Sequence, residues 1–284
     1  MGVNVDTNKY PGEFVITNRN VMSYAPPSDI IIRGKHCSRG YIPPNKAARK
    51  QGLQALRDEG SLIPFDFPIL SKPERLEAIK QMTAEKNLLS DRRLSLKIPS
   101  LDQNGTNYCW GNGVVSAIIL RRMLMGGGYI PLSPASGCAP ITGFRNNGGW
   151  GVDFIRYTSK YGINTVNEWP ANAIDKRYYT EANKELAKRN MVLKWMELEP
   201  GNRDQLMTAM VLRLPVALGY SWWSHEVCGI DPAITNGDES GRIWNSWSDA
   251  WSYMGMAVLA ANKFFDFDDA VIPVVMSPQH SIAA

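Results

Sequence analysis

The sequence predicts an α+β protein, because helical patterns fill the middle of the chain and strand patterns follow them. The 284 residues are 44% hydrophobic and 20% charged, which is typical of a packed globular protein. Short extended patterns separated by Gly, Asp and Asn turns begin only after Pro215, so helices and strands are segregated rather than alternating. All nine Trp lie between Trp110 and Trp251, and nine of the 18 Pro precede residue 100. A Trp-rich body therefore follows a Pro-punctuated N-terminal segment.

The first 70 residues are expected to be mostly extended segments and turns, because recurring prolines interrupt helical hydrogen bonding there. Two helices are expected at residues 45–59 and 73–88, the second with Ser71 as its N-cap. A third starts at Cys109, is apolar around most of its circumference and ends at a run of three glycines. Further helices are expected from Gly149 to about Lys160 and at residues 175–189 and 203–213. Strands are expected at residues 216–220, 226–230, 242–246 and 256–260.

Charge and cysteine usage exclude several classes of function. The formal net charge is +4, and the basic residues are too scattered for a nucleic-acid interface. No apolar run reaches the ~20 residues that a membrane span needs, and the first twenty residues lack the apolar core of a signal peptide. The four Cys and three His are not at metal-ligand spacing. We therefore expect a cytoplasmic protein with reduced thiols and with neither a metal nor another cofactor.

Three residues together indicate nucleophilic chemistry. Cys109 lies at a predicted helix N-terminus, where unpaired N–H groups and the helix dipole stabilise a thiolate. His225 opens a predicted strand and could serve as its base, and Asn245 on the next strand could orient the imidazole. Each residue alone has a simpler interpretation, since a lone Cys or His is usually part of the core.

The sequence around these residues resembles the papain-like cysteine peptidase family. Residues 102–110 read D-Q-N-G-T-N-Y-C-W, similar to the family's nucleophile motif D/N-Q-G-x-C-G-x-C-W. Residues 245–247 read N-S-W, and Trp251 and Gly255 follow at the family's spacing. Three further stretches match in order: N-N-G-G-W at residues 146–150, Y-G-I at residues 161–163, and a helix followed by Pro-Val and a strand at residues 206–220.

The resemblance implies a two-lobed papain-like fold. Its helical lobe would contain the buried helix that starts at Cys109, and its other lobe would be an antiparallel, β-barrel-like structure. It also implies a thiol hydrolase that cleaves peptide or isopeptide bonds in a peptide or protein substrate. Cys109 would be the nucleophile, His225 the base and Asn245 its orienting partner, the Cys-His-Asn variant of the triad.

The remaining family positions carry further implied roles. Gln103 would help to hold the oxyanion, and Trp247 would shield the His–Asn hydrogen bond. Gly148 and Gly149 match the stretch that pairs with substrate backbone. Glu226 follows His225, where the family usually has Ala or Gly lining the pocket for the substrate's second side chain, and it would either select a basic side chain or fill that pocket.

The sequence also departs from the family pattern. Thr106 and Asn146 stand where the family has two cysteines that bond to each other. Gly111 and Gly113 weaken a helix that is usually stronger there. The motifs span a papain-like domain at residues 91–262, so we expect a Pro-rich extension at residues 1–90, without the family's long-helix inhibitory pattern, and a C-terminal tail at residues 263–284.

These departures keep two alternatives open. The first is a non-catalytic structural or assembly protein that reuses the fold, for example a phage virion or capsid decoration component. Such a protein would form homo-oligomers or a capsid-like assembly through its two arms, and it would be located in the virion. The second is another thiol acyl-transfer enzyme, such as an amidase or transglutaminase, which the N-S-W-x₃-W-x₃-G spacing disfavours.

Overall fold

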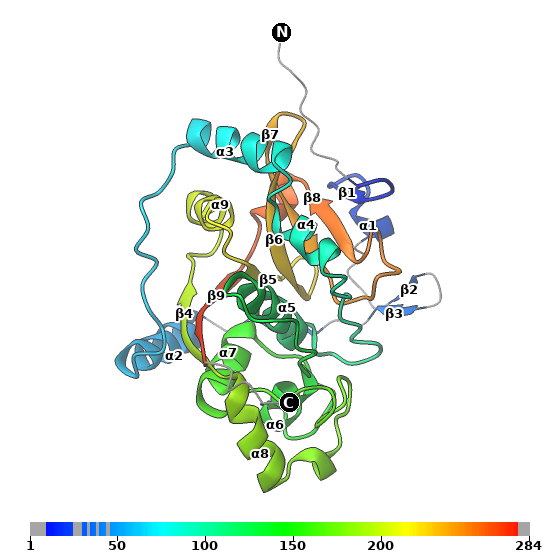
Figure 1. Cartoon of the computed structure of the whole chain (residues 1–284), viewed down its shortest axis with the longest axis vertical. Coiled ribbons are helices and arrows are strands. Elements are labelled where there is room, and N and C mark those ends of the chain that lie inside the picture. The colour runs from blue at the N-terminus through cyan, green and yellow to red at the C-terminus, as the bar shows by residue number, and fades with distance from the viewer. Residues whose placement is uncertain (1–9, 25–29, 33–34, 38–39, 44–45, 278–284) are drawn as a thin grey trace.

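The computed structural model describes residues 10–24, 30–32, 35–37, 40–43 and 46–277. Helices α6, α7 and α8 gather at one end of the molecule, the sheet with α3 lies at the other, and α5 runs between them (Figure 1). The outermost parts of the expected extension and tail, residues 1–9 and 278–284, lie outside the described residues.

The helices follow the predicted order, and several begin within one or two residues of their expected positions. Their bounds are α1 (Val21–Tyr24), α2 (Lys46–Asp58), α3 (Lys72–Ala84), α4 (Leu89–Ser95), α5 (Cys109–Leu124), α6 (Ala135–Ile141), α7 (Gly151–Tyr161), α8 (Glu181–Ala187), α9 (Arg203–Val211) and α10 (Ala261–Phe264). Ser71 is the N-cap of α3, as predicted, and its backbone N–H donates to Glu74 Oε2 at 2.7 Å. The short helices α4 and α6 were not predicted, because seven residues give too few turns for a periodic pattern.

One seven-stranded sheet has the order β1-β8-β7-β6-β5-β9-β4. Every neighbouring pair is antiparallel except β1 with β8, which is parallel. The α+β prediction is confirmed. The strands of this sheet are β1 (Phe14–Ile16), β4 (Val192–Glu197), β5 (Val216–Tyr220), β6 (His225–Thr235), β7 (Asp238–Trp244), β8 (Met256–Leu259) and β9 (Asp269–Met276), and β2 (Ile30–Ile32) pairs separately with β3 (Lys35–Cys37).

The alternation of side chains across the sheet separates two hydrophobic clusters. On β5, Val216, Leu218 and Tyr220 face the cluster that contains α9, whereas Ala217 faces the cluster built around α5. On β6, Val227 joins the α9 side and Cys228 joins the α5 side. Because successive strand residues point to opposite faces, His225 and Glu226 are directed to opposite sides of the sheet.

The two glycines that weaken α5 permit its close packing. A Cβ on Gly111 would stand 2.2 Å from the Sγ of Cys138, and a Cβ on Gly113 would stand 3.2 Å from the Cγ of Glu226. Each glycine lowers the helix propensity by about 1 kcal/mol relative to Ala, and its missing side chain lets α5 approach α6 and β6 closely.

Segments outside the expected domain limits of 91 and 262 belong to the same fold. In the expected extension, β1 pairs with β8, and Glu13 forms a buried ion pair with Arg242 on β7 at 2.6 Å. In the expected tail, β9 lies inside the sheet between β5 and β4. Pro273 has no backbone N–H to donate, which argues against a strand there. However, β5 pairs only with residues 269–271 of β9, so Pro273 lies outside the β5–β9 pairing. Among the described residues, no helix is long and apolar enough to cross a membrane.

Candidate active site

Cys109 is the first residue of α5, and it is fully buried. Burial and then the charge of Glu226 raise the pKa of its thiol to about 12, while backbone hydrogen bonds from Glu226, Trp110 and Gly40 act in the opposite direction. The expectation that the helix N-terminus leaves a stabilised thiolate therefore does not hold in this conformation. The reason is physical, because loss of solvent disfavours the charged form more than the nearby N–H groups favour it.

The backbone N–H of Glu226 donates a hydrogen bond to the Cys109 thiol, so β6 approaches the nucleophile candidate at the residue that follows His225. His225 Nε2 is 2.8 Å from Asn245 Oδ1. The same Oδ1 accepts the backbone N–H of Ser246 at 2.8 Å, so it is the amide oxygen rather than the nitrogen that faces the ring. An oxygen only accepts, so Nε2 carries the proton, and Nδ1 is the acceptor nitrogen of the neutral imidazole.

Two tryptophans hold the imidazole in place. The ring of Trp247 stacks on His225 with centroids 4.7 Å apart, and Trp223 meets it edge-on at 4.8 Å. All three side chains are buried, so the His225–Asn245 hydrogen bond is shielded from water. Trp247 lies where its predicted shielding role requires, whereas the contribution of Trp223 was not foreseen from the sequence.

Gln103 is buried and hydrogen-bonded to Ser246, the residue that follows Asn245. Its backbone N–H donates to the carbonyl of Ser246 at 3.0 Å, and the Ser246 hydroxyl donates to Gln103 Oε1 at 2.6 Å. Its Nε2 donates to the carbonyl of Thr106 at 2.9 Å. These bonds fix the orientation of the amide predicted to contribute to an oxyanion site.

Hydrogen bonds connect the two loops at which the resembling family has a disulfide. The Asn107 backbone N–H donates to Asn146 Oδ1 at 2.7 Å, and its side chain donates to the Asn146 carbonyl at 2.9 Å. Asn146 Nδ2 donates in turn to the carbonyl of Gly105 at 2.9 Å. Thr106 instead turns its hydroxyl to the carbonyl of Gln103, so Asn107 rather than Thr106 makes the connection to Asn146.

Residues 40–43, which we call the covering segment, cross the site. The Gly149 N–H donates to the carbonyl of Gly40 at 2.7 Å, and the Ile42 N–H donates to the carbonyl of Gly149 at 2.9 Å. The Tyr41 N–H also donates to the carbonyl of Ser224, next to His225, at 3.2 Å. The stretch predicted to pair with substrate backbone therefore pairs with the protein's own chain. No local pattern in residues 40–43 signals this contact, which joins segments more than 100 residues apart.

Glycines are required where the covering segment passes. A Cβ on Gly148 would stand 2.3 Å from the carbonyl oxygen of Gly40, and a Cβ on Gly149 would stand 2.6 Å from the indole of Trp110.

Glu226 is fully buried between β6 and α7. Burial, together with the charge of Asp269, raises the pKa of Glu226 well above the usual range.

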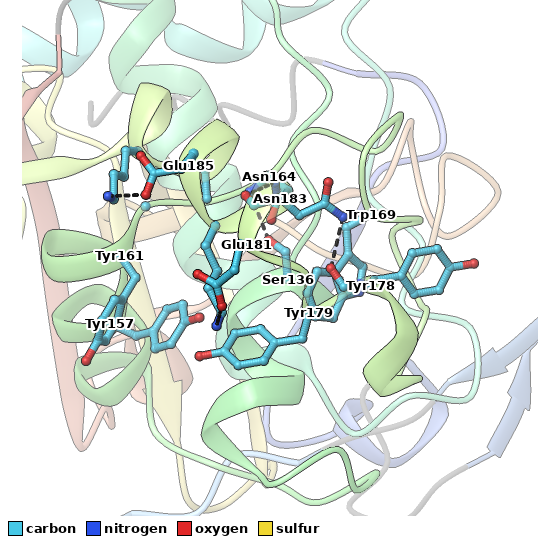
Figure 2. A pocket seen from close by; sticks show the side chains of 14 residues that line it. Ser136, Tyr157, Tyr161, Asn164, Trp169, Tyr178, Tyr179, Glu181, Asn183 and Glu185 are labelled. Carbon is cyan, nitrogen blue, oxygen red and sulfur yellow. Dashed lines mark hydrogen bonds and ion pairs between the residues drawn. The ribbon is translucent and has the colours of Figure 1, made fainter.

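A separate cavity of about 290 Å³ lies between α7 and α8 (Figure 2). Its walls are aromatic, but its polar groups are used internally. Asn164 Nδ2 donates to the carbonyl of Asn183 at 2.8 Å, and Trp169 Nε1 donates to the carbonyl of Ala173 at 2.7 Å. None of the predicted site residues lines it. Within the described part of the chain, no group of three His, Cys, Asp or Glu side chains could hold a metal ion.

Comparison with known proteins gives a fold but no close relative. No protein-family model matches the chain, and no curated protein matches its sequence. A digestive procathepsin L 3 from the larval midgut of Tenebrio molitor matches at a TM-score of 0.53 and 20% identity, over 62% of this chain and 66% of that one, just under two thirds of its length. Xylellain, a cysteine protease from Xylella fastidiosa, matches at a TM-score of 0.54 and 17% identity, over 63% and 83% of the two chains.

A digestive procathepsin L2 proteinase from Tenebrio molitor matches over more of the sequence, 92% of this chain and 81% of that one, at a TM-score of 0.53 and 16% identity. Identities this low establish architecture rather than activity. The chain has the papain-like fold of these cysteine proteases.

Proposed function

We propose that the protein is a thiol hydrolase that cleaves peptide or isopeptide bonds and that its structure represents a covered form of the site. The observation that carries the proposal is the His225–Asn245 hydrogen bond at 2.8 Å, enclosed by two tryptophans, with Cys109 against the next residue of β6. A nucleophile at the start of α5, a base at the start of β6 and an orienting amide just after β7 supply the three groups that this chemistry needs.

The proposed reaction begins at Cys109, which transfers its proton to His225 Nδ1 while its sulfur attacks the carbonyl carbon of the scissile bond. The oxyanion is held by the Cys109 N–H and the Gln103 amide, and losing one such donor typically costs about 10²–10³ in rate. His225 then protonates the leaving amine, and water hydrolyses the thioester to release the acid and restore the thiol.

The covering segment must leave before a substrate binds, because it occupies the backbone of Gly149 and contacts the thiol. The test uses the full chain and the variant Tyr41→Ala, which removes the buried side chain of that segment. An epoxide thiol probe should modify Cys109 faster in Tyr41→Ala than in the unmodified chain, and Cys109→Ala should abolish the adduct. A folded Tyr41→Ala protein that neither reacts at Cys109 nor hydrolyses any peptide would reject the proposal.

The burial of Cys109 favours a second candidate function, a non-catalytic structural or assembly protein. In that case the covering segment is permanent and the fold serves as a scaffold for homo-oligomers or a capsid-like partner. This candidate predicts a stable oligomer in solution and an inert thiol in Tyr41→Ala. A monomeric chain with a reactive Cys109 would exclude it. The cytoplasmic or virion location stays a prediction from the sequence.

A further inference from the structure

Two groups of aromatic side chains bound the cavity between α7 and α8. Tyr157 and Tyr161 on α7 form the first group, with ring centroids 4.8 Å apart. In the second group the ring of Trp169 lies 5.8 Å from that of Tyr178 and 6.5 Å from that of Tyr179. Figure 2 shows the α7 pair on one side and Trp169 with Tyr178 on the other, while Tyr179 points toward Tyr157. A space of about 290 Å³ is therefore walled mainly by aromatic rings.

The floor of this cavity is buried, and its polar groups bond to the protein itself. Ser136, Asn164 and Trp169 are all less than 5% exposed. The Ser136 hydroxyl donates to the carbonyl of Ser133 at 2.8 Å and accepts the backbone N–H of Asn164 at 3.1 Å. The side-chain donors of Asn164 and Trp169 also go to backbone carbonyls. A ligand in the cavity would therefore bind mainly through contact with the rings.

The charged groups at the rim of the cavity are paired with one another. Lys184 Nζ lies 2.7 Å from Glu181 Oε1, and Lys188 forms the equivalent pair with Glu185 three residues before it. The two pairs leave these four groups with no net charge. A charged ligand that entered the cavity would lose its hydration without gaining an unpaired counter-charge.

The aromatic walls alone would also suit a cation, because the face of an aromatic ring attracts positive charge. Lys184 already supplies that charge, since its Nζ lies 4.3 Å from the centroid of the Tyr179 ring. A second cation at this wall would be repelled by the first. Burial, followed by the charge of Tyr179 and a hydrogen bond with it, raises the pKa of Tyr157, so that phenol stays neutral. Both the rim and the walls thus favour an uncharged ligand.

We propose that this cavity is a binding site for a small, neutral, flat aromatic molecule whose ring packs against Tyr157 and Tyr179. Its volume is close to the lower end, about 300 Å³, of the range for small-molecule sites. Aromatic walls favour a ring over a saturated group of the same size, because offset and edge-to-face ring contacts add to the burial of apolar surface. Cys109 and His225 do not line the cavity, so the proposed ligand is distinct from the substrate of the hydrolase.

Four probes of similar size test the chemical class of the ligand. Binding of naphthylmethanol, naphthylmethylammonium, naphthoate and decahydronaphthylmethanol to the full-length protein is measured by isothermal titration calorimetry. The neutral flat alcohol should bind about fivefold or more tightly than its saturated counterpart and than either charged probe. Equal or tighter binding of any of those three probes overturns the inference, and so does a lack of naphthylmethanol binding up to its solubility limit.

Substitutions in the walls locate the binding site. Tyr179→Leu and Tyr161→Leu should each weaken naphthylmethanol binding by about fivefold, because each removes one aromatic wall. Tyr161 is 45% exposed, so its replacement leaves the fold intact even if Tyr179→Leu does not. Tyr129→Leu alters a comparably exposed tyrosine outside the cavity and is the matched control. Folded cavity variants that bind as tightly as Tyr129→Leu would reject this site.

Replacing Lys184 tests the charge argument. Lys184→Met keeps an apolar chain beside Tyr179 but removes the ammonium and leaves Glu181 unpaired. Binding of naphthylmethylammonium should therefore strengthen relative to that of naphthylmethanol. An unchanged ratio of the two affinities would contradict the assignment to a neutral ligand. None of these measurements requires turnover, so their results do not depend on whether Cys109 is catalytic.

Discussion

The carbonyl oxygen of Gly40 accepts a hydrogen bond from the backbone N–H of Gly149 at 2.7 Å, and this contact closes the candidate active site. Gly40 also contributes a backbone hydrogen bond to the Cys109 thiol. A segment from the Pro-rich part of the chain therefore occupies both the surface predicted to bind substrate backbone and the space above the nucleophile candidate.

Crowding at Gly148 should open the site. A Cβ at this position would stand 2.3 Å from the Gly40 carbonyl oxygen and 2.8 Å from Ile42 Cδ1, so Gly148→Ala should displace the covering segment. We expect labelling of Cys109 by an epoxide thiol probe to become about tenfold faster or more, measured by mass spectrometry of the intact protein. Gly128→Ala has open space around its Cβ and is the control. Equal labelling rates in the two variants would show that the segment does not limit access.

Removing the partner of the imidazole should impair turnover more than folding. Asn245→Ala deletes the oxygen that accepts from His225 Nε2, so the ring can adopt the wrong tautomer or orientation. In the Tyr41→Ala background we expect kcat/KM to fall by about 10²-fold or more. Asn190→Ala removes a comparably buried amide, bonded to the Ile163 carbonyl at 2.9 Å, and should lower stability without this loss. Similar kcat/KM values for the two variants would contradict the assigned role of Asn245.

Stability should decline between pH 4 and pH 7. Burial raises the pKa of Asp269 to about 7, with Arg49 acting against the shift and Glu197 adding to it. The folded state therefore keeps a proton that the unfolded chain releases near pH 4, so the free energy of unfolding falls as pH rises through this window. At about 1.4 kcal/mol per pKa unit, a shift from near 4 to about 7 corresponds to a loss on the order of 4 kcal/mol, and Asp269→Asn should remove most of it.

The control for this pH dependence is a carboxyl with the opposite shift. Although partial burial alone would raise the pKa of Asp238, hydrogen bonds from Lys72 and Arg203 lower it to about 2. Its contribution is present above pH 4 and is lost only as the pH falls below that value. In urea unfolding, the free energy of unfolding of Asp238→Asn should therefore decline between pH 4 and pH 7 as it does in the unmodified chain. If the free energy of unfolding of Asp269→Asn declines with the same slope, the assignment to Asp269 is contradicted.

The buried ion pair of the N-terminal segment should be important for stability. Arg242 donates to Glu13 at 2.6 Å and lies 3.5 Å from Asp231, and all three side chains are almost fully buried. Arg242→Ala leaves two uncompensated buried carboxyls, so we expect a loss of about 3–5 kcal/mol in urea unfolding. Arg177→Ala breaks an exposed pair with Asp175 and should cost less than about 1 kcal/mol. Comparable losses in the two variants would contradict this assessment.

The sequence predicted those features that depend on local pattern. The helix that begins at Cys109 and the strand at Val216–Tyr220 have the expected starts, because apolar periodicity and flanking glycine or proline define them. The family resemblance grouped Cys109, His225 and Asn245, and the structure joins two of them, since His225 Nε2 lies 2.8 Å from Asn245 Oδ1.

Features that join distant segments could not be predicted in this way. Glu13 and Arg242 are 229 positions apart, and no pattern in either segment shows the other as its partner. The same holds for Gly40 with Gly149, and for the ring of Tyr41 with Gly219. The strand at Asp269–Met276 was missed, and its Pro273, which has no N–H to donate, lies beyond the β5 pairing and next to a register irregularity of β4.

The pH profile of Cys109 modification tests the central claim most directly. In the unmodified chain burial holds the thiol pKa near 12, so labelling should be slow and should keep increasing up to the highest pH that the fold tolerates. In Tyr41→Ala the thiol meets solvent beside His225, so labelling should be faster and already near its maximum at neutral pH. A Tyr41→Ala profile that matches the unmodified chain in both rate and midpoint would contradict a covered, activated nucleophile.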